Sequence, residues 1–229
     1  MILSEFRTLI RAYVPSAKVS VIPTDLLDTL INKAVEEVNV RARALPSSTA
    51  FTTTANIATY SLLTYLPRYV TMNVGGLWWN SGTVLVPDWT RLEAFTRGSL
   101  QDIYTAWMND AAGDPKRYII EGDSLIIHPT PDATLAGALW AFYIAAPVAM
   151  TADTHYPFSG STSEITSLTV FDDAIIDYVR WKLSRPLGTD QQGIITEKNY
   201  MEVLTERTIL YENRLDIGAN NSRMRGPSI

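Results

Sequence analysis

Few residues in this chain have the types and spacing that catalysis or metal binding requires. The two histidines, His128 and His155, have no second histidine or carboxylate at the spacing of a metal motif, and cysteine is absent. No nucleophile elbow, phosphate-binding loop or dinucleotide fingerprint occurs, and residues 159–161 (Ser-Gly-Ser) are typical of a loop. Adjacent carboxylates such as Asp172 and Asp173 would point about 100° apart on a helix. The sequence therefore predicts no enzyme, no cofactor and no metal site.

Aromatic residues are the next candidates, because the chain has six tryptophans. Trp78 and Trp79 are consecutive in a predicted strand, so one of them must point away from the core. An outward tryptophan could be covered by a neighbouring loop or short helix, could contact a protein partner, or could stack on a sugar ring. We take both as candidate interface residues.

The C-terminal segment is the second candidate. Residues 216–229 lack apolar periodicity, which predicts a flexible arm in the free chain. Such an arm could be a solubilising end, or it could fold on a partner, with arginine making bidentate contacts and Met and Ile filling apolar pockets. The candidate docking residues are Asn220, Arg223, Met224, Arg225 and Ile229.

Charge divides the chain into regions. Residues 1–45 and 171–229 hold 28 of the 43 charged residues, whereas residues 46–170 hold 5 basic and 10 acidic residues with 8 of the 12 prolines. Charged segments with helical periodicity predict helices, and the low-charge middle predicts strands and turns. The net charge of −5 argues against a general nucleic-acid coat. No apolar run approaches the roughly 18–20 residues of a membrane span, and the N-terminus lacks the features of a signal peptide.

Four helices are expected in the charged regions. The first covers residues 4–13 with Ser4 as N-cap, the second runs from Thr24 to before Pro46, and the third starts at Asp172 as cap. The fourth runs over 194–215 with a buried stripe of Ile194, Met201, Leu204, Thr208, Tyr211 and Leu215. Amphipathic helices need partners, so the first pair must meet the last pair, with residues 46–170 looped out between them.

The middle region carries hairpin signals. Strands at 117–121 and 124–128 flank a Gly122-Asp123 turn, and strands at 75–79 and 83–86 flank a turn at 80–82. A further strand is expected at 139–147 and two more within 50–74. Residues 88–95 and 99–107 are predicted as short helices, and 151–169 as an exposed loop.

The predicted fold class is α+β. It is a four-helix-type bundle from the N- and C-terminal helix pairs (1–45 and 171–215) with an inserted antiparallel β-sandwich or barrel (46–170) and a flexible C-terminal arm (216–229).

In order and spacing, these features resemble the head-to-tail adaptor proteins of tailed bacteriophages, also called connector, head-completion or tail tubular proteins. The matching motifs are residues 115–118 (PKRY), 121–123 (EGD), 125–131 (LIIHPTP), 143–147 (YIAAP) and 171–178 (FDDAIIDY). The resemblance covers roughly residues 115–215 in motifs and residues 1–45 in architecture only.

The resemblance implies a structural virion protein that is made in the host cytoplasm and located at the neck between capsid and tail. Copies of the chain would form a ring, usually of twelve, between the portal protein and a tail tube, nozzle or fibre protein. Double-stranded DNA would pass through the ring without sequence-specific binding. The C-terminal arm would bind the portal, and Trp78 and Trp79 would lie at a tail-side or neighbour interface.

Two other classes stay open. A β-sandwich module that binds a glycan or receptor is suggested by the outward tryptophan. A cell-wall hydrolase would need two carboxylates about 5–10 Å apart in a cleft, and the sequence nominates no such pair.

Overall fold

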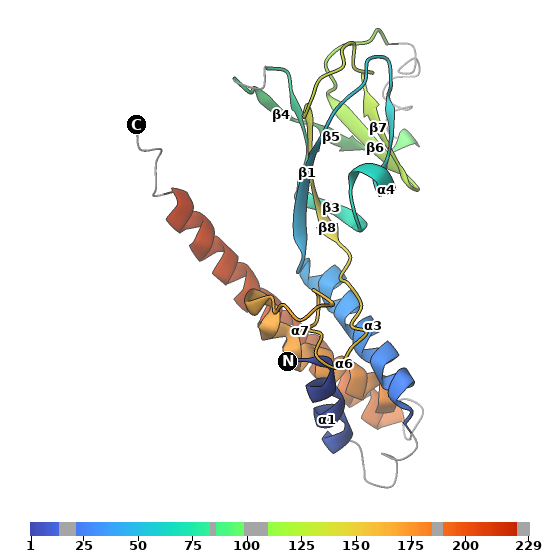
Figure 1. Ribbon diagram of the computed structural model, residues 1–229, viewed down its shortest axis with the longest axis vertical. Coiled ribbons are helices and arrows are strands. Elements are labelled where there is room, and N and C mark those ends of the chain that lie inside the picture. Colours follow the sequence, from blue (N-terminus) through green and yellow to red (C-terminus); the bar gives the residue numbers. More distant parts are fainter. Residues whose placement is uncertain (14–21, 83–85, 99–109, 185–189, 224–229) are drawn as a thin grey trace. The chain divides into compact units, whose positions relative to one another are not determined.

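The computed structural model describes residues 1–13, 22–82, 86–98, 110–184 and 190–223, with the backbone alone for 190–195 and 214–223 (Figure 1). The chain divides into two compact units, Met1–Ala44 with Pro147–Ile229, and Leu45–Ala146. The first unit is mainly helical and the second is mainly β, so the fold is α+β. In the following, they are called the helical unit and the β-rich unit.

The helical unit is organised around α6 (Asp172–Ser184), which packs against α1 (Leu3–Tyr13), α3 (Thr24–Ala42) and α7 (Asp190–Arg223). A 3₁₀ helix, η2 (Thr166–Phe171), runs directly into α6. Helices from the two ends of the sequence thus lie side by side (Figure 1), as their amphipathic patterns require.

Aromatic contacts join α6 to α7 in this core. The rings of Trp181 and Tyr200 stack with centroids 5.7 Å apart, and the ring of Tyr178 meets Tyr200 edge-on at 5.3 Å. Around them the buried side chains include Phe6, Ile10, Leu27, Ile31, Val38, Phe158, Phe171, Ile175, Val179, Leu204 and Tyr211. Every helix of the described unit therefore contributes to one apolar core.

Charged and polar side chains orient α1 on α3. The Arg7 guanidinium donates two hydrogen bonds to the carboxylate of Asp28 in α3 and one to Asp153. The carboxylates raise the pKa of Arg7 further above its ordinary value. Arg11 donates to the Thr24 hydroxyl at 3.0 Å. Both arginines of α1 are thus directed toward other parts of the unit.

The expected helix caps were wrong. α1 begins at Leu3, so Ser4 lies inside the helix, and α3 begins after Pro23, which leaves Thr24 in its first turn. Asp172 already has helical dihedral angles because η2 precedes it. A short polar side chain is favourable at several positions near the start of a helix. The conformation of the preceding residues determines which residue becomes the N-cap.

Residues 147–170 belong to the helical unit, and the loop expected at 151–169 is exposed over only part of its length. Phe158 and Leu168 are buried, and the Phe158 ring lies 6.2 Å from that of Phe171. The backbone N–H of Leu3 donates to the carbonyl of His155 at 3.0 Å. This segment looked polar in sequence, and its few apolar residues are the ones that anchor it.

The β-rich unit contains two four-stranded sheets. In the first sheet the strand order is β1 (Pro46–Phe51), β8 (Leu139–Ala145), β3 (Tyr69–Asn80) and β4 (Trp89–Arg91). In the second sheet the order is β2 (Thr59–Ser61), β7 (Ser124–His128), β6 (Arg117–Glu121) and β5 (Glu93–Phe95). A short helix, α4 (Leu62–Tyr65), follows β2. The strand pairs are antiparallel except for β5 with β6. One core cluster takes side chains from both sheets, among them Phe51, Tyr60, Leu77, Trp79, Tyr118, Leu125, Ile127, Leu139 and Tyr143.

One predicted hairpin is confirmed and the other is wrong. β6 and β7 pair across Gly122-Asp123, where Gly122 has φ 54°. β3 instead pairs with β4, part of the segment 88–95 that was expected to be helical. Residues 83–85 and the helix expected at 99–107 lie outside the described residues. The sequence of segment 88–95 is compatible with two short strands or with one helix. It forms strands because β4 hydrogen-bonds to β3 and β5 hydrogen-bonds to β6.

Helix α7 differs from the prediction in length and in its buried face. It continues to Arg223, eight residues beyond the expected end at 215. Met201, expected in the buried stripe, is 38% exposed, whereas its neighbour Tyr200 is fully buried. Leu204 and Tyr211 of the predicted stripe are buried as expected, and Tyr200 takes the place of Met201 because its ring packs against Tyr178 and Trp181 of α6.

Two buried tyrosines of α7 give a matched test of the core. The Tyr211 hydroxyl donates to the Ala44 carbonyl at 3.0 Å, whereas the Tyr200 hydroxyl has no hydrogen-bond partner among the described residues. Tyr211→Phe should lower the free energy of unfolding by about 1–2 kcal/mol, because the carbonyl is left unpaired in the interior. Tyr200→Phe should leave it unchanged or raise it, since only an unpaired buried hydroxyl is removed.

Urea denaturation of both variants beside the wild type measures the difference. Equal destabilisation by the two substitutions would contradict this assignment of the hydrogen bond.

Candidate interaction surfaces

The two candidate tryptophans point to opposite faces of β3. Trp79 is 2% exposed, and its indole N–H donates to the Asp114 carboxylate at 3.2 Å. Trp78 is half-buried on the other face, where its indole N–H donates to the Gly75 carbonyl at 2.7 Å. Because Trp79 belongs to the core, it is not a surface residue of the structure, and only Trp78 stays a candidate for contact with a partner.

Trp78 belongs to a larger set of rings. It lies opposite Trp140 of β8 in the strand register, and Trp140 is 37% exposed. The Trp140 ring lies 4.9 Å from that of Phe142 and 5.6 Å from that of Trp89. We call Trp78, Trp89, Trp140 and Phe142 the aromatic face. Alternation in the β8 sequence LWAFYIA was the signal that could have identified Trp140 and Phe142.

Gly75 permits this packing. A Cβ atom at position 75 would lie 2.8 Å from the Cβ of Phe142, closer than real side chains approach. The absence of a side chain there lets the Phe142 ring lie over β3.

The proposed C-terminal docking residues are only partly within the described chain. Asn220 and Arg223 lie in the last turns of α7, where the backbone alone is described. Met224, Arg225 and Ile229 lie outside the described residues. Their role in docking stays a prediction.

The two histidines each have a close polar partner among the described residues. Nε2 of His128 lies 3.2 Å from the Asp110 carboxylate, and Nδ1 of His155 accepts from the Thr151 N–H at 3.3 Å. In the described ranges, no group of three or more His, Asp or Glu side chains is arranged to hold a metal ion. No described helix combines the length and apolar character that crossing a bilayer needs.

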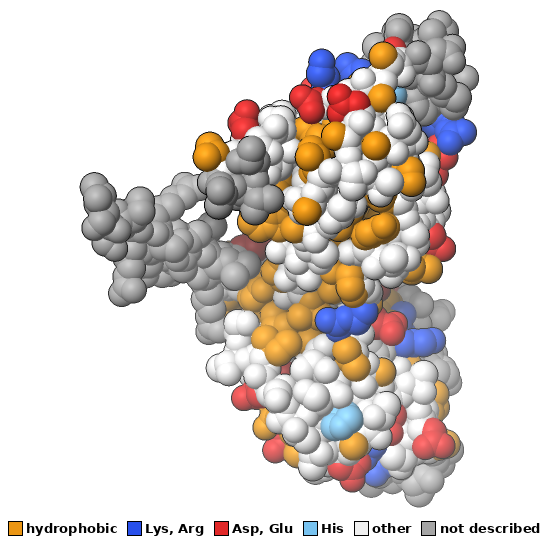
Figure 2. All heavy atoms as spheres, turned by 45° about the horizontal axis from the view of Figure 1, so that its top comes forward, with side chains coloured by type: hydrophobic (Ala, Val, Ile, Leu, Met, Phe, Trp, Pro, Cys, Tyr) orange, Lys and Arg blue, Asp and Glu red, His pale blue; other side chains and the backbone are white. Residues whose placement is uncertain are grey.

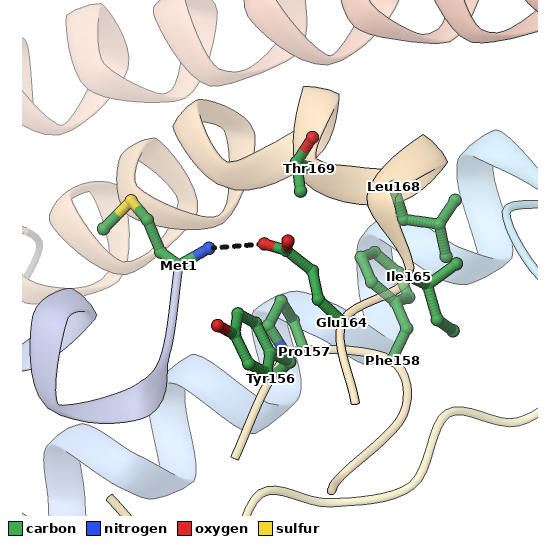
Figure 3. Close-up of a pocket in the computed structure, with 8 residues that line it drawn as sticks. All are labelled: Met1, Tyr156, Pro157, Phe158, Glu164, Ile165, Leu168 and Thr169. Atoms are coloured by element: carbon green, nitrogen blue, oxygen red, sulfur yellow. Dashed lines mark ion pairs between the residues drawn. The ribbon is translucent and has the colours of Figure 1, made fainter. Parts of the chain in front are cut away.

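The N-terminus lies beside a small hollow (Figure 3). The Met1 amino group is 2.8 Å from the Asp172 carboxylate and 3.8 Å from that of Glu164. The hollow, which Phe158 and Leu168 also line, has a volume of about 10 Å³. Ligand sites typically have about 300–1,000 Å³. We therefore interpret this place as an anchor for the first residue and not as a binding site.

Large apolar side chains are exposed on three helices of the helical unit. They are Leu9 and Tyr13 on α1, Leu26 and Val40 on α3, and Met201, Ile209 and Leu210 on α7. Exposed apolar side chains grouped on a few elements mark surfaces for protein contact more often than ligand sites. None of these side chains was predicted from the sequence to lie at an interaction surface.

Asp172 gives a prediction about pH. Burial raises its pKa from 3.8 to about 6, although the Met1 ammonium favours the ionised form. Between these values the folded state binds more protons than the unfolded state, so the carboxyl lowers the free energy of unfolding as pH rises from 4 to 6, by on the order of 2 kcal/mol. In Asp172→Asn this contribution is absent. The stability of the wild type relative to the variant should therefore fall across this window.

Urea denaturation at pH 4, 5, 6 and 7 provides the measurement. Asp173→Asn is the control, because Asp173 lies in the same turn but is 64% exposed and pairs with Arg207. Parallel pH curves for Asp172→Asn and the wild type would contradict the assignment.

Comparison with known proteins identifies the family of the chain. A family model described as SU10 adaptor protein matches residues 1–224 and thus spans both units. No curated protein matches the chain significantly. The chain belongs to the SU10 adaptor protein family, a family of bacteriophage head-to-tail adaptors.

Proposed function

We propose that copies of this chain form an oligomeric ring, of twelve copies, that joins the portal protein to the tail at the virion neck and continues the DNA channel. The observation that carries the proposal is the family match along residues 1–224. The exposed apolar side chains on α1, α3 and α7 support it, because a ring needs surfaces on which neighbours pack.

In this proposal the two units have different tasks. The helical unit, as a four-helix-type bundle, forms the ring wall. The β-rich unit, as an inserted sandwich, contacts a tail tube, nozzle or fibre protein, or a neighbouring copy. The aromatic face is the candidate surface for that contact, since Trp78 and Trp140 lie side by side on it and Trp140 is partly exposed.

DNA would pass the ring without being gripped. The chain has 19 basic and 24 acidic residues, which does not favour a strong phosphate-binding surface. On the face shown in Figure 2, acidic and basic side chains are scattered among uncharged ones. A channel of this composition would let the genome slide.

The C-terminal arm would couple ring formation to portal binding. Residues 216–223 were expected in a flexible arm but continue α7, so ordering against the portal would concern residues 224–229; Arg223 and Arg225 would make polar contacts, and Met224 and Ile229 apolar ones. Ordering costs conformational entropy, which the contacts with the portal would offset. Rings would therefore form on the portal and not in free solution.

Negative-stain electron microscopy of the purified chain, alone and mixed with the portal ring from the same genome, tests this proposal. We expect monomers alone and a rotationally symmetric ring on the portal. Rings that form without the portal would support the adaptor function but would exclude the proposed coupling of ring formation to portal binding.

A second candidate is a module that binds a glycan or receptor, and the aromatic face favours it because flat indole rings stack on sugars. Monomers under both conditions, together with retention of the full chain on a glycan matrix, would support this candidate.

Deleting residues 219–229 should abolish portal binding and leave the fold intact. The described core contacts of α7 come from Tyr200, Leu204 and Tyr211, all upstream of the deletion. Co-sedimentation with portal rings measures binding, and circular dichroism with urea denaturation checks the fold. Wild-type affinity in the truncated chain would refute the docking role of the arm.

A further inference from the structure

The solvent-facing stripe of α1 carries little charge. Glu5, Thr8, Leu9 and Ala12 follow helical spacing and are all exposed, and Glu5 is the one charged member. The two arginines of the helix are bonded to α3 and the 151–157 region instead. A surface helix ordinarily places its charges outward. This stripe, called the α1 stripe, therefore has the composition of a covered surface.

A shallow groove beside α7 has a similar composition. It is lined by Met201, Leu204, Thr205, Thr208 and Ile209 of α7 and by Arg41 of α3. We call this the α7 groove. The adjacent stripe of the same helix carries Lys198, Glu202 and Glu206, and the first two form an ion pair at 3.6 Å. The groove is thus distinct from the ordinary surface of its own helix.

Threonine hydroxyls on both surfaces are already satisfied. The hydroxyl of Thr8 donates to the Ser4 carbonyl at 2.9 Å, and those of Thr205 and Thr208 donate to the carbonyls of Met201 and Leu204 at 2.8 Å. These threonines can therefore present their methyl groups outward. Both surfaces can lose water without leaving a hydroxyl unpaired, which removes the main cost of burying a polar group.

The two surfaces also differ in charge and position. The α1 stripe has one carboxylate, Glu5, and the α7 groove has one guanidinium, Arg41, whose Nε also bonds Glu37. α1 contacts α3 at Thr24 and Asp28, whereas the groove lies beside Arg41. The 13 residues from position 28 to 41 of α3 span roughly 20 Å. A head-to-tail contact between copies needs two such different, complementary surfaces on one subunit.

From this complementarity, and resting on the proposed ring, we infer that neighbouring copies pack with the α1 stripe of one copy in the α7 groove of the next. Leu9 inserts between Met201 and Ile209, and Glu5 pairs with Arg41. The contact is heterologous, so each copy uses both surfaces, and the series of contacts closes into a ring where the rotation between neighbours divides a full turn evenly, as the proposed ring requires.

Cross-linking can test this pairing directly, because the chain has no cysteine of its own. Leu9→Cys and Thr205→Cys chains are mixed on portal rings and treated with a short bismaleimide. We expect covalent dimers from the mixture, ladders from the double variant, and no dimers from either single variant alone. Ile57→Cys replaces Leu9→Cys as the control, since Ile57 is similarly exposed but lies in the β-rich unit.

The outcomes separate the two proposals. Portal-bound rings that give no Leu9–Thr205 cross-link, or dimers from one single variant alone, would overturn this interface and leave the ring intact. Wild-type chain that forms no ring with the portal would overturn the proposed function and the interface together.

A second variant set guards against cross-linking artefacts. Leu9→Asp should reduce the yield of portal-bound rings roughly tenfold or more, while Ile57→Asp should not. Urea denaturation of the free chains is the check that both variants are folded. Equal ring yields for Leu9→Asp and the wild type would contradict the inference.

Discussion

The helical unit depends on the burial of α6 by helices from both ends of the sequence. None of these amphipathic helices buries its apolar face by itself, and α6 packs against α1, α3 and α7 together. The stacked rings of Trp181 and Tyr200 fix α7 on α6, and the hydrogen bond from Tyr211 to the Ala44 carbonyl fixes α7 to the end of α3. Residues 45–146 can therefore be inserted between these helices in the sequence without dividing the core.

The same packing decides which side chains stay outside. Because Tyr200 packs against α6 and Leu204 is buried, the rotation of α7 leaves Met201, Thr205 and Ile209 at the surface. Because Arg7 and Arg11 bond to other parts of the unit, the outer stripe of α1 keeps mainly uncharged residues. The exposed apolar surface of the unit thus follows from how its core and its ion pairs are arranged.

The described side chains with charge or aromatic rings are placed by the needs of the fold and its surfaces. Buried charged groups serve the fold, as with the Met1 amino group beside Asp172 and the Arg7 guanidinium between Asp28 and Asp153. In the β-rich unit, alternation along β3 and β8 divides the aromatic residues between core and surface, with Trp79 inside and Trp78 and Trp140 outside. Aromatic residues are enriched at protein interfaces, so the outward rings of Trp78 and Trp140 suit contact with another protein.

The sequence by itself determined the features that depend on near neighbours: the helical segments, the β6–β7 hairpin at Gly122-Asp123, strand β8, and the family motifs. Periodicity and turn chemistry act over a few residues, so they can be read from sequence. Which of Trp78 and Trp79 is buried, the pairing of β3 with residues 89–91, and the outward position of Met201 were decided by the tertiary structure alone. The α1 stripe and the α7 groove were also decided by the tertiary structure. A surface consists of the side chains that the rest of the fold leaves uncovered, and this depends on contacts between residues far apart in the chain.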